Sequence, residues 1–235
     1  IFKKIDIENF TKFYGNNDLF RLLVQHRFND FEKLVKLYNY TKKYYDNVLF
    51  FEERKKIFMD MVPYRYKCDD KKLGEVCKIS SGKYSTKDMK DIGKYPYYSG
   101  KSNNPNGFLD EYCYDSKEYI ILIKDGGAGE KVYGDQIGLG KSFYVSGKSA
   151  FSCHQLAIEP NLPNISVRYL YFYMNSIKNN IMDLAHYTNG LGCINQNTVN
   201  TKIKIIIPPL EDQQEIVKRM ESYDTMIKMF KDDIN

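Results

Sequence analysis

Hydrophobic residues recur at helical spacing in the first part of the chain, before residue 63. One stripe of residues three or four apart consists of Val24, Phe28, Phe31, Val35 and Tyr38. A second stripe, with charged residues between its members, consists of Phe50, Arg54, Ile57 and Met61. This spacing predicts two helices between residues 17 and 62, and Pro63 is expected to end the helical region. The stripes fit either an ordinary core or the packing of a helical hairpin or coiled coil.

The pattern changes at Leu73, where short apolar runs alternate with clusters of Gly, Asn, Asp and Ser. The runs are YIILI (119–123), SFYV (142–145) and QLAIE (155–159), and runs of this kind between turn residues are typical of strands. Residues 73–165 are therefore predicted to form a β-rich unit. A helix is expected from Val167 to about Leu184, with one apolar face made of Leu170, Met174, Ile177 and Ile181. After it we expect a loop over residues 186–199 and a strand over residues 202–207.

Pro208 and Pro209 follow this strand, where they are expected to stop strand pairing and to begin a helix. The last helix carries apolar residues at alternating spacings of four and three, which is a heptad pattern. These predicted helix-interface residues are Ile216, Met220, Tyr223, Ile227, Phe230 and Ile234. Their partner is predicted to be either the N-terminal helices of the same chain or a helix of another chain.

The chain is mildly basic, with a formal net charge of +5 and a pI of about 8.7. Such a charge permits an anionic partner without requiring one. Between Lys67 and Lys101 the sequence has nine Lys against five Asp or Glu, and these charges are interleaved with tyrosines. The ammonium groups can neutralise phosphates while the rings pack on sugars or bases, so this stretch favours contact with nucleic acid.

Residues that would indicate catalysis or metal binding form no recognised pattern. The five cysteines and three histidines contain no C-x-x-C pair, so we predict no metal site and reduced thiols in a cytoplasmic protein. The GLGKS segment (138–142) lacks the first glycine of a phosphate loop, because that position is Asp135. Cys153 and His154 are adjacent, and adjacent residues on a strand point to opposite faces, so they are not expected to form a catalytic pair.

Two further absences point the same way. The sequence contains no methyltransferase motif for S-adenosylmethionine and no carboxylate pattern of a metal-dependent nuclease. We therefore predict a protein that is not itself an enzyme.

In addition, no apolar run reaches the roughly 18 residues that span a bilayer.

Four segments together resemble the specificity subunit of type I restriction-modification systems. They are KKLGEVCKISSGK (71–83), KYPYYSGKSNNPNGFLDEY (94–112), YIILIKDGGAGEKVYG (119–134) with SAFSCHQLAIEP (149–160), and INQNTVNTKIKIIIPPLEDQQEIVKRM (194–220). They resemble a strand leading to a Ser-Gly turn, a Tyr-Pro-Tyr-Tyr loop, a Gly-Asp-Gly-type turn with a later His strand, and a closing Pro-Pro-Leu helix. Their order covers about 150 residues, whereas residues 1–62 match the family only as generic helices.

This resemblance implies an α+β fold, in which a β-rich DNA target recognition domain is flanked by long helices of coiled-coil type. The implied divisions are an N-terminal helical region (1–66), the target recognition domain (67–209) and a C-terminal coiled-coil helix (210–235). Family members recognise half of a split site in double-stranded DNA and position an adenine methyltransferase subunit, together with a motor nuclease subunit where the system cleaves. They carry no cofactor of their own, since S-adenosylmethionine is expected in the partner methyltransferase.

The chain departs from the full-length family pattern because it has one recognition domain in place of two. It therefore resembles half of a longer subunit, a half-size subunit that forms a homodimer, or a piece of a methylase fusion. Two other hypotheses stay open beside this one. The chain could be a helical interaction or antagonist protein that occupies a methyltransferase without directing it, or it could be a nuclease or other enzyme.

Loops rich in Lys, Asn, Gln and Tyr can contact base edges in the major groove, where Asn or Gln pairs with adenine and Lys reaches guanine. The predicted DNA-binding residues fall into three groups, which are Lys83, Tyr84, Ser85 and Lys87; Tyr97, Tyr98, Lys101, Asn103 and Asn104; and Lys124, Lys131, Lys141, His154 and Gln155. Tyr97 and Tyr98 also fit a place in the core. Asn195 and Gln196 fit either a cap before the last strand or a contact with DNA.

Overall fold

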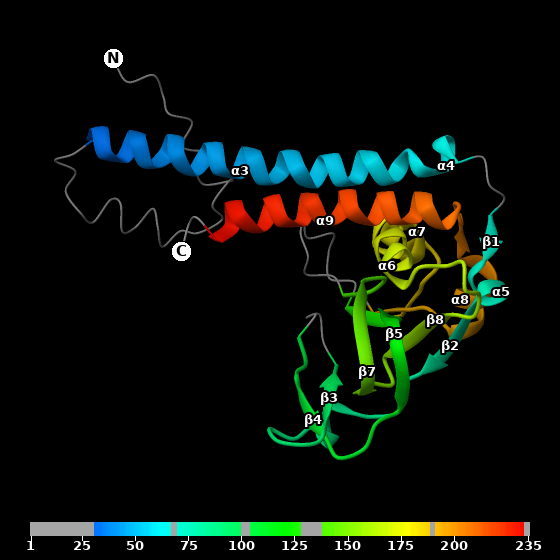
Figure 1. Ribbon diagram of the computed structural model, residues 1–235. Helices are drawn as coiled ribbons and strands as arrows, with labels where there is room; N and C mark the ends of the chain where they lie inside the picture. The colour runs from blue at the N-terminus through cyan, green and yellow to red at the C-terminus, as the bar shows by residue number, and fades with distance from the viewer. Residues whose placement is uncertain (1–30, 67–69, 100–103, 128–137, 189–190, 233–235) are drawn as a thin grey trace.

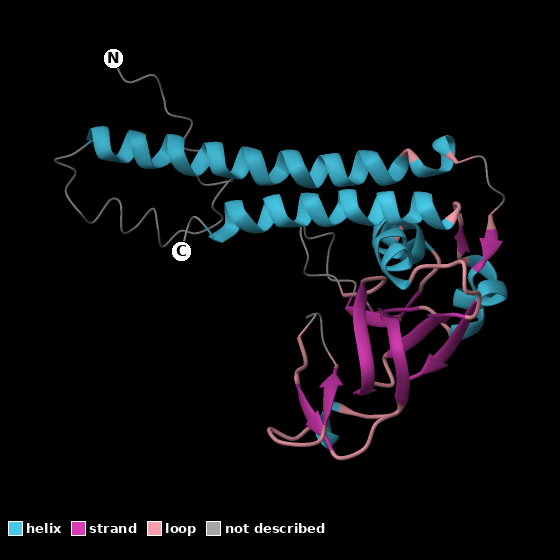
Figure 2. Cartoon of the chain, viewed as in Figure 1, coloured by secondary structure: helices cyan, strands magenta, loops and turns pink. Residues whose placement is uncertain are grey.

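The computed structural model describes residues 31–66, 70–99, 104–127, 138–188 and 191–232. Two long helices lie side by side along one edge of the molecule, and a β-rich body hangs from one end of the pair (Figure 1). Helices and strands are both present in quantity, so the predicted α+β class is confirmed (Figure 2). None of the helices in the described ranges combines the length and apolarity that a bilayer-spanning segment needs.

The N-terminal part of the described chain is one continuous helix, α3 (Phe31–Asp60), followed by the short α4 (Val62–Arg65). The prediction of a break into two helices was therefore wrong for the residues after Phe31, while Val24 and Phe28 lie outside the described residues. Pro63 does not end the helical region but lies in the first turn of α4. A proline is tolerated there because the first amides of a helix have no partner within the helix.

Helix α9 (Leu210–Asp232) runs antiparallel to α3. The first turns of α9 contact α4, which follows α3, since Arg65 of α4 lies 3.8 Å from Glu215, and the last turn contacts an earlier part of α3, since Lys231 lies 3.7 Å from Glu52. The predicted seam of α9 is thus filled by the chain's own N-terminal helix. That outcome was one of the two that the heptad pattern left open.

Apolar side chains pack together in the seam between α3 and α9. Ile216, Met220 and Ile227 are buried, and they pack with α3 residues such as Val48 and Met59. Tyr223 and Phe230 are half-buried, and their rings lie 6.3 and 5.9 Å from the ring of Phe51. Ile234, the last predicted seam residue, lies outside the described residues.

The α3 stripe predicted from Phe50, Ile57 and Met61 does not face this seam. These side chains are 47%, 55% and 58% exposed, whereas Val48 and Met59 are buried. The predicted helix was correct, but its buried face is turned away from the predicted stripe. Which α3 residues are buried depends on how α9 packs against α3, and this tertiary contact cannot be read from the α3 sequence alone.

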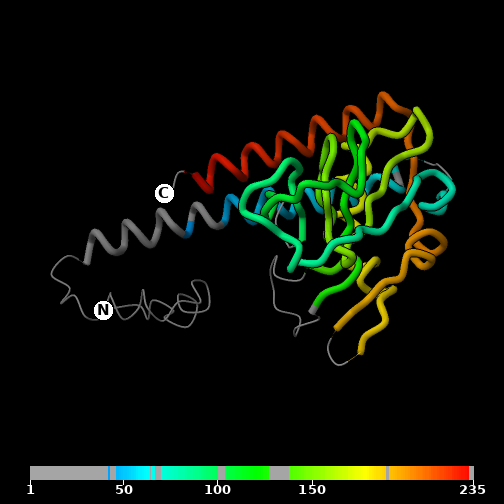
Figure 3. The backbone as a smooth tube through the Cα atoms, turned by 90° about the horizontal axis from the view of Figure 1, so that it is seen from below, coloured from blue at the N-terminus to red at the C-terminus, as the bar shows by residue number. Residues whose placement is uncertain are grey.

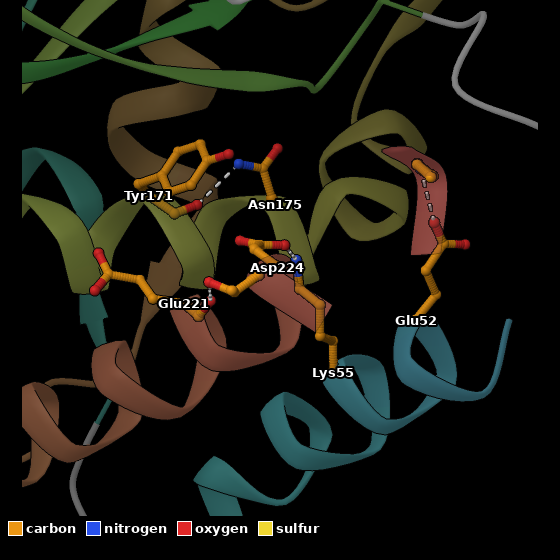
Figure 4. A network of polar contacts seen from close by, with 8 residues as sticks. Glu52, Lys55, Tyr171, Asn175, Glu221 and Asp224 are labelled. Carbon is orange, nitrogen blue, oxygen red and sulfur yellow. Dashed lines mark hydrogen bonds and ion pairs between the residues drawn. The ribbon is translucent and has the colours of Figure 1, made fainter. Parts of the chain in front are cut away.

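Charged side chains line the α3–α9 seam. Figure 4 shows Lys55 of α3 pointing toward Asp224 of α9, with which it forms an ion pair. Glu52 of α3 forms a second ion pair, with Lys231 in the last turn of α9. Arg219 of α9 lies 4.9 Å from the ring of Phe58 on α3. Exposed ion pairs contribute little to the free energy of unfolding, so these pairs mainly restrict the register of the two helices.

The centre of the body is a six-stranded sheet in the order β2-β8-β5-β7-β3-β4. Its strands are β2 (Cys77–Ser81), β3 (Tyr95–Tyr98), β4 (Gly107–Leu109), β5 (Tyr114–Ile123), β7 (Ser142–Phe151) and β8 (Gln155–Pro160). All neighbours are antiparallel except β3 and β7, which are parallel. The three predicted apolar runs lie in β5, β7 and β8, so these strands are confirmed.

Both faces of this sheet are covered. Ile120 and Leu122 of β5 point into the larger core, which includes residues of α6 (Val167–Ser176), α7 (Lys178–Asp183) and α9. Tyr119 and Ile121, which alternate with them along the strand, point into a second core on the opposite face. Burial on both sides explains why the run is continuously apolar and does not alternate with polar residues.

The helix expected from Val167 to about Leu184 is present as α6 and α7, with an interruption at Ile177. Leu170, Met174 and Ile181 on its predicted apolar face are buried. The region after it was predicted incorrectly, because it is not a loop followed by a long strand. It contains β9 (His186–Thr188), β10 (Leu191–Cys193), α8 (Gln196–Lys202) and the two-residue β11 (Lys204–Ile205), which pairs with β1 (Lys71–Lys72) beside α5 (Leu73–Val76).

Gln213 joins the start of α9 to the body. Its side chain is fully buried. Its side-chain oxygen Oε1 accepts a hydrogen bond from the Ser166 amide at 2.9 Å. Its side-chain nitrogen Nε2 donates to the backbone carbonyl oxygens of Asn164 at 2.9 Å and Pro208 at 2.7 Å. A buried amide with three such bonds fixes where the helix leaves the domain.

Candidate nucleic-acid interface

The three predicted groups of DNA-contacting residues converge on one turn between β7 and β8. This central turn consists of Phe151, Ser152, Cys153 and His154. The carbonyl oxygen of Phe151 accepts hydrogen bonds from the amides of Lys83 at 3.3 Å and Tyr84 at 3.4 Å. The Cys153 amide donates to the carbonyl oxygen of Tyr84 at 3.0 Å. The first group is therefore held on the central turn by its backbone.

The other two groups are tied to the same turn. The Ser152 amide donates to the carbonyl oxygen of Tyr98 at 3.0 Å, and the Lys124 amide donates to the carbonyl oxygen of His154 at 3.1 Å. Segments that lie up to seventy residues apart in the sequence thus form one surface. Loops held on a rigid sheet in this way are a common arrangement for binding.

Gly82 allows the first segment to lie this close to the central turn. A Cβ atom at this position would lie 2.1 Å from the carbonyl oxygen of Ser152 and 2.6 Å from that of Phe151. No side chain fits such a distance from backbone atoms. The Ser-Gly step noted in the sequence is therefore required by a close approach of two backbones.

Within the first group the side chains differ in role. Lys83 and Lys87 are exposed, and neither has an ion-pair partner among the residues that the structure describes. Ser85 caps the short 3-10 helix η1 (Thr86–Asp88), since its hydroxyl oxygen accepts from the Lys87 amide at 3.2 Å. Tyr84 is half-buried with its hydroxyl 3.5 Å from Glu111, and burial, followed by that carboxylate, raises the pKa of the phenol.

Two predicted contact residues are buried and support the surface from below. Tyr97 is 0% exposed in the middle of β3, and Gln155 is 1% exposed at the start of β8. The side-chain oxygen of Gln155 accepts a hydrogen bond from the Ser152 amide at 3.1 Å. Neither side chain has a surface to offer DNA, so we correct both predictions and assign these residues to the support of the central turn.

The remaining predicted residues lie on or near the surface. Asn104 is exposed, Tyr98 is half-buried, and burial raises the pKa of its phenol. Lys124 and Lys141 are half-buried, and the ammonium group of Lys141 lies 5.8 Å from the centre of the Phe143 ring. Three predicted contact residues lie outside the described residues, namely Lys101, Asn103 and Lys131.

His154 is exposed, and its ring is oriented by a carboxylate. Its Nδ1 atom lies 2.8 Å from the carboxylate oxygen of Asp125, and 64% of its side chain is exposed. The central turn thus presents an imidazole whose Nδ1 is engaged by the protein. The prediction that Cys153 and His154 do not form a catalytic pair stays a prediction.

A small sheet beside His154 was missed from the sequence. It has the order β6-β10-β9, where β6 is Asp125–Gly127. Each strand has only three residues, and β6 lies about sixty residues before its partners. The available signal was the two-residue spacing of His186 and Thr188, and of Leu191 and Cys193, which is the strand period.

Asn195 and Gln196, for which two roles were open, both make structural contacts. The side-chain oxygen of Asn195 accepts from the Thr198 amide at 2.8 Å and so caps α8. The side chain of Gln196 donates to the carbonyl oxygen of Ile79 at 2.9 Å and accepts from the Ser81 hydroxyl at 3.0 Å. Gln196 thus fastens α8 to β2.

The described residues contain no group of three His, Cys, Asp or Glu side chains that is placed to hold a metal ion. The thiol of Cys77 is buried, and burial raises its pKa to about 12, so it is protonated at neutral pH. The chemistry of this surface is that of hydrogen-bond donors, acceptors and cations.

Comparison with known families assigns the chain. The family described as type I restriction modification DNA specificity domain matches residues 67–235. The chain belongs to this family. A specificity domain recognises DNA and is not catalytic, and the resemblance drawn from the four sequence segments is thereby confirmed.

Solved structures of specificity subunits share the fold. The S subunit of a type I restriction-modification system from M. genitalium has 18% identity and a TM-score of 0.58, with 86% of this chain and 53% of that chain covered. The HsdS subunit from Thermoanaerobacter tengcongensis has 13% identity and a TM-score of 0.57, with 84% and 49% covered.

A third similar chain comes from a structure whose description concerns complex assembly and conformational transition of the type I R-M system. It has 14% identity and a TM-score of 0.54. It is covered to 52%, and this chain to 85%. The chain thus spans about half the length of these structural relatives. Comparison with curated protein sequences found no significant match.

Proposed function

We propose that the chain is a sequence-specific DNA-binding specificity subunit of a type I-like restriction-modification system. It recognises a half-site in double-stranded DNA and positions an adenine methyltransferase subunit. The observation that carries the proposal is the convergence of three segments on the central turn, in a chain of the DNA specificity family. Lys83 and Lys87 supply phosphate contacts, and His154 supplies a contact to bases.

The β-rich body and the helices have different functions in this proposal. The target recognition domain spans residues 67–209 and contacts DNA, while residues 1–66 and 210–235 form the helical parts. This division is supported by the start of the family match at residue 67 and by the start of α9 at Leu210. The α3–α9 pair acts as an antiparallel coiled coil that sets the distance from this half-site to a second one.

The second half-site requires a second recognition domain. A homodimer or a further half of a longer subunit supplies it, in agreement with the half-length coverage of the structural relatives. Methylation itself takes place in the partner, which holds S-adenosylmethionine. A motor nuclease subunit joins where the system also cleaves DNA.

The proposal is tested by competition between duplexes in the presence of the cognate methyltransferase. Binding to one sequence is expected to exceed binding to scrambled duplexes by about a thousandfold or more. Equal affinity for all duplexes of the same length and composition would contradict it.

A second candidate function is supported by the exposed apolar side chains of α3. Phe50 and Ile57 of α3, and Met61 directly after it, form a face that α9 does not cover, so the helices alone would suffice to occupy a methyltransferase as an antagonist. Reconstitution separates the two candidates. Methylation at a defined sequence supports a specificity subunit, whereas a methyltransferase that is blocked by the chain supports an antagonist.

A further inference from the structure

The β9–β10 hairpin has two faces of different character. In its pairing Cys193 lies opposite His186, and Leu191 lies opposite Thr188. Residues directly opposite each other project to the same side of a sheet. All four are exposed, and Leu191 is 60% exposed. These four residues form what we call the outer face of the hairpin.

The inner face is packed against the body at Gly192, whereas the side chain of Tyr187 is 51% exposed. Gly192 is buried, and a Cβ atom there would lie 2.7 Å from Cδ2 of Leu139 and 2.8 Å from Cε1 of Tyr187. The hydroxyl of Tyr187 donates to the carbonyl oxygen of Met182 at 3.1 Å. Because the inner face is fixed in this way, the hairpin presents its outer face in a defined orientation.

The third strand brings His154 next to the outer face. Asp125 of β6 lies opposite Cys193 of β10, so its carboxylate is on the same side as the outer face. That carboxylate engages Nδ1 of His154 at 2.8 Å. The amide of Ile194 donates to the carbonyl oxygen of Lys124 at 2.7 Å, which extends the pairing of β10 toward the central turn.

The β9 and β10 strands extend beyond the rest of the β-structure at the lower edge of Figure 3, where they are drawn in yellow and gold. With β6 beside it, the hairpin forms an outlying three-stranded sheet that has β9 at one edge. A B-DNA major groove about 12 Å wide admits a ribbon of two strands. Along a strand, residues two apart are separated by about 6.8 Å, which is close to two base-pair steps of about 3.4 Å.

We propose that the outer face of the β9–β10 hairpin, together with the Asp125–His154 pair, contacts base edges in the major groove and determines part of the recognised sequence. This inference rests on the proposed function and names a surface for it. The occupant is the edge of DNA bases, because the face combines hydrogen-bonding groups with an isolated apolar side chain. Its one carboxylate, Asp125, is already engaged by His154, and Lys124 lies beside it.

The chemistry of each position follows. When Nδ1 of the neutral His154 ring donates to Asp125, Nε2 is an acceptor and pairs with the amino group of adenine or cytosine. Asp125 is a positioning residue in this arrangement. Leu191 and the methyl group of Thr188 offer apolar contact to the thymine methyl group. His154 and Leu191 are expected to specify different base pairs of one half-site.

The test is selection of bound duplexes from a pool with a randomised central segment, using the full chain with its methyltransferase. His154→Ala is expected to lower the preference at one base position by about tenfold, while the other positions keep theirs. Asp125→Ala is expected to affect the same position as His154→Ala, and Asp125→Asn to retain the preference, since its amide oxygen still accepts. Leu191→Ala is expected to affect a different position, and Leu162→Ala, another exposed leucine, none.

Thermal unfolding of each variant checks that it folds, and His154→Asn replaces His154→Ala should the latter not fold. An unchanged sequence preference in the His154 and Leu191 variants would overturn the inference while leaving the proposed function standing. Uniform weakening at all positions would also overturn it, because that is the effect of a phosphate contact. A loss of self-association on changing Leu191, with the preference unchanged, would assign the face to a protein partner instead. A wild-type selection without any enriched sequence would refute the proposed function and the inference with it.

Discussion

At the scale of single residues, Gln213 and Gly82 explain two short motifs of the sequence by their contacts. The Pro-Pro-Leu segment is followed by a glutamine whose side chain is buried in three hydrogen bonds. The Ser-Gly step contains the glycine that lets two backbones meet at the central turn. Both motifs were visible in the sequence, but their physical reasons depend on partners far along the chain.

Replacing Gln213 tests the junction between body and helix. Gln213→Leu leaves the Ser166 amide and the carbonyl oxygens of Asn164 and Pro208 without their partner, so the free energy of unfolding should fall by about 3 kcal/mol. Urea denaturation followed by circular dichroism measures this change. Gln214→Leu, at the exposed neighbouring position, should stay within about 0.5 kcal/mol of the wild type. Equal effects of the two changes would disprove the assigned role.

Replacing Gly82 tests the close approach at the central turn. Gly82→Ala places a methyl group against the carbonyl oxygens of Ser152 and Phe151, and it should lower the free energy of unfolding by about 2 kcal/mol or more. Thermal unfolding gives the measurement. Gly126→Ala is the control, because a Cβ there would meet only an atom 3.8 Å away. A Gly82 variant as stable as the wild type would show that the two backbones do not approach this closely.

At the scale of elements, the sequence predicted what depends on local pattern and missed what depends on distant contacts. The strand at 119–123 was evident because apolar residues run without interruption, and α9 because its stripe keeps one period for nearly three heptads. The β9–β10 hairpin was missed because each strand has three residues and its third strand is distant in sequence. The buried face of α3 was misplaced because α9 covers Val48 and Met59 and leaves Phe50 and Ile57 exposed.

The packing of α9 on α3 can be tested within one helix. Met220 is buried in the seam and Met229 is 58% exposed. Met220→Ala should lower the free energy of unfolding by about 2 to 4 kcal/mol, since it removes buried methylenes. Met229→Ala should change it by less than about 0.5 kcal/mol. If chemical denaturation gave the two variants the same stability, the heptad stripe would not be the buried seam.

At the scale of the whole molecule, a pair of antiparallel helices carries a body whose loops contact one turn. The net charge of +5 is modest, so binding to DNA should depend on particular lysines more than on an overall field. The sequence predicted Lys83 and Lys87 as DNA contacts because lysines are frequent in this stretch and interleaved with tyrosines, and both side chains are exposed in the structure. It could not exclude Tyr97 or Gln155, because only the folded sheet shows that they lie beneath the surface.

The salt dependence of duplex binding tests this whole-molecule electrostatics. Affinity should fall steeply with salt concentration, and Lys83→Ala and Lys87→Ala should each lower the slope of log K against log[salt] by about one. Lys56→Ala, on α3 and away from the central turn, should leave the slope unchanged. Fluorescence anisotropy between low and moderate salt gives these slopes. Identical slopes for all four proteins would exclude Lys83 and Lys87 from phosphate contact.

The central claim is that this chain selects the DNA sequence at which a methyltransferase acts. Methylome sequencing of a host carrying the gene with its neighbouring methyltransferase, compared with the same host after deletion of this gene alone, tests it most directly. The account predicts adenine methylation at one defined sequence, absent after the deletion and changed in sequence, not merely in amount, by His154→Ala. The same methylated sequence in both hosts, at the same level, would contradict it.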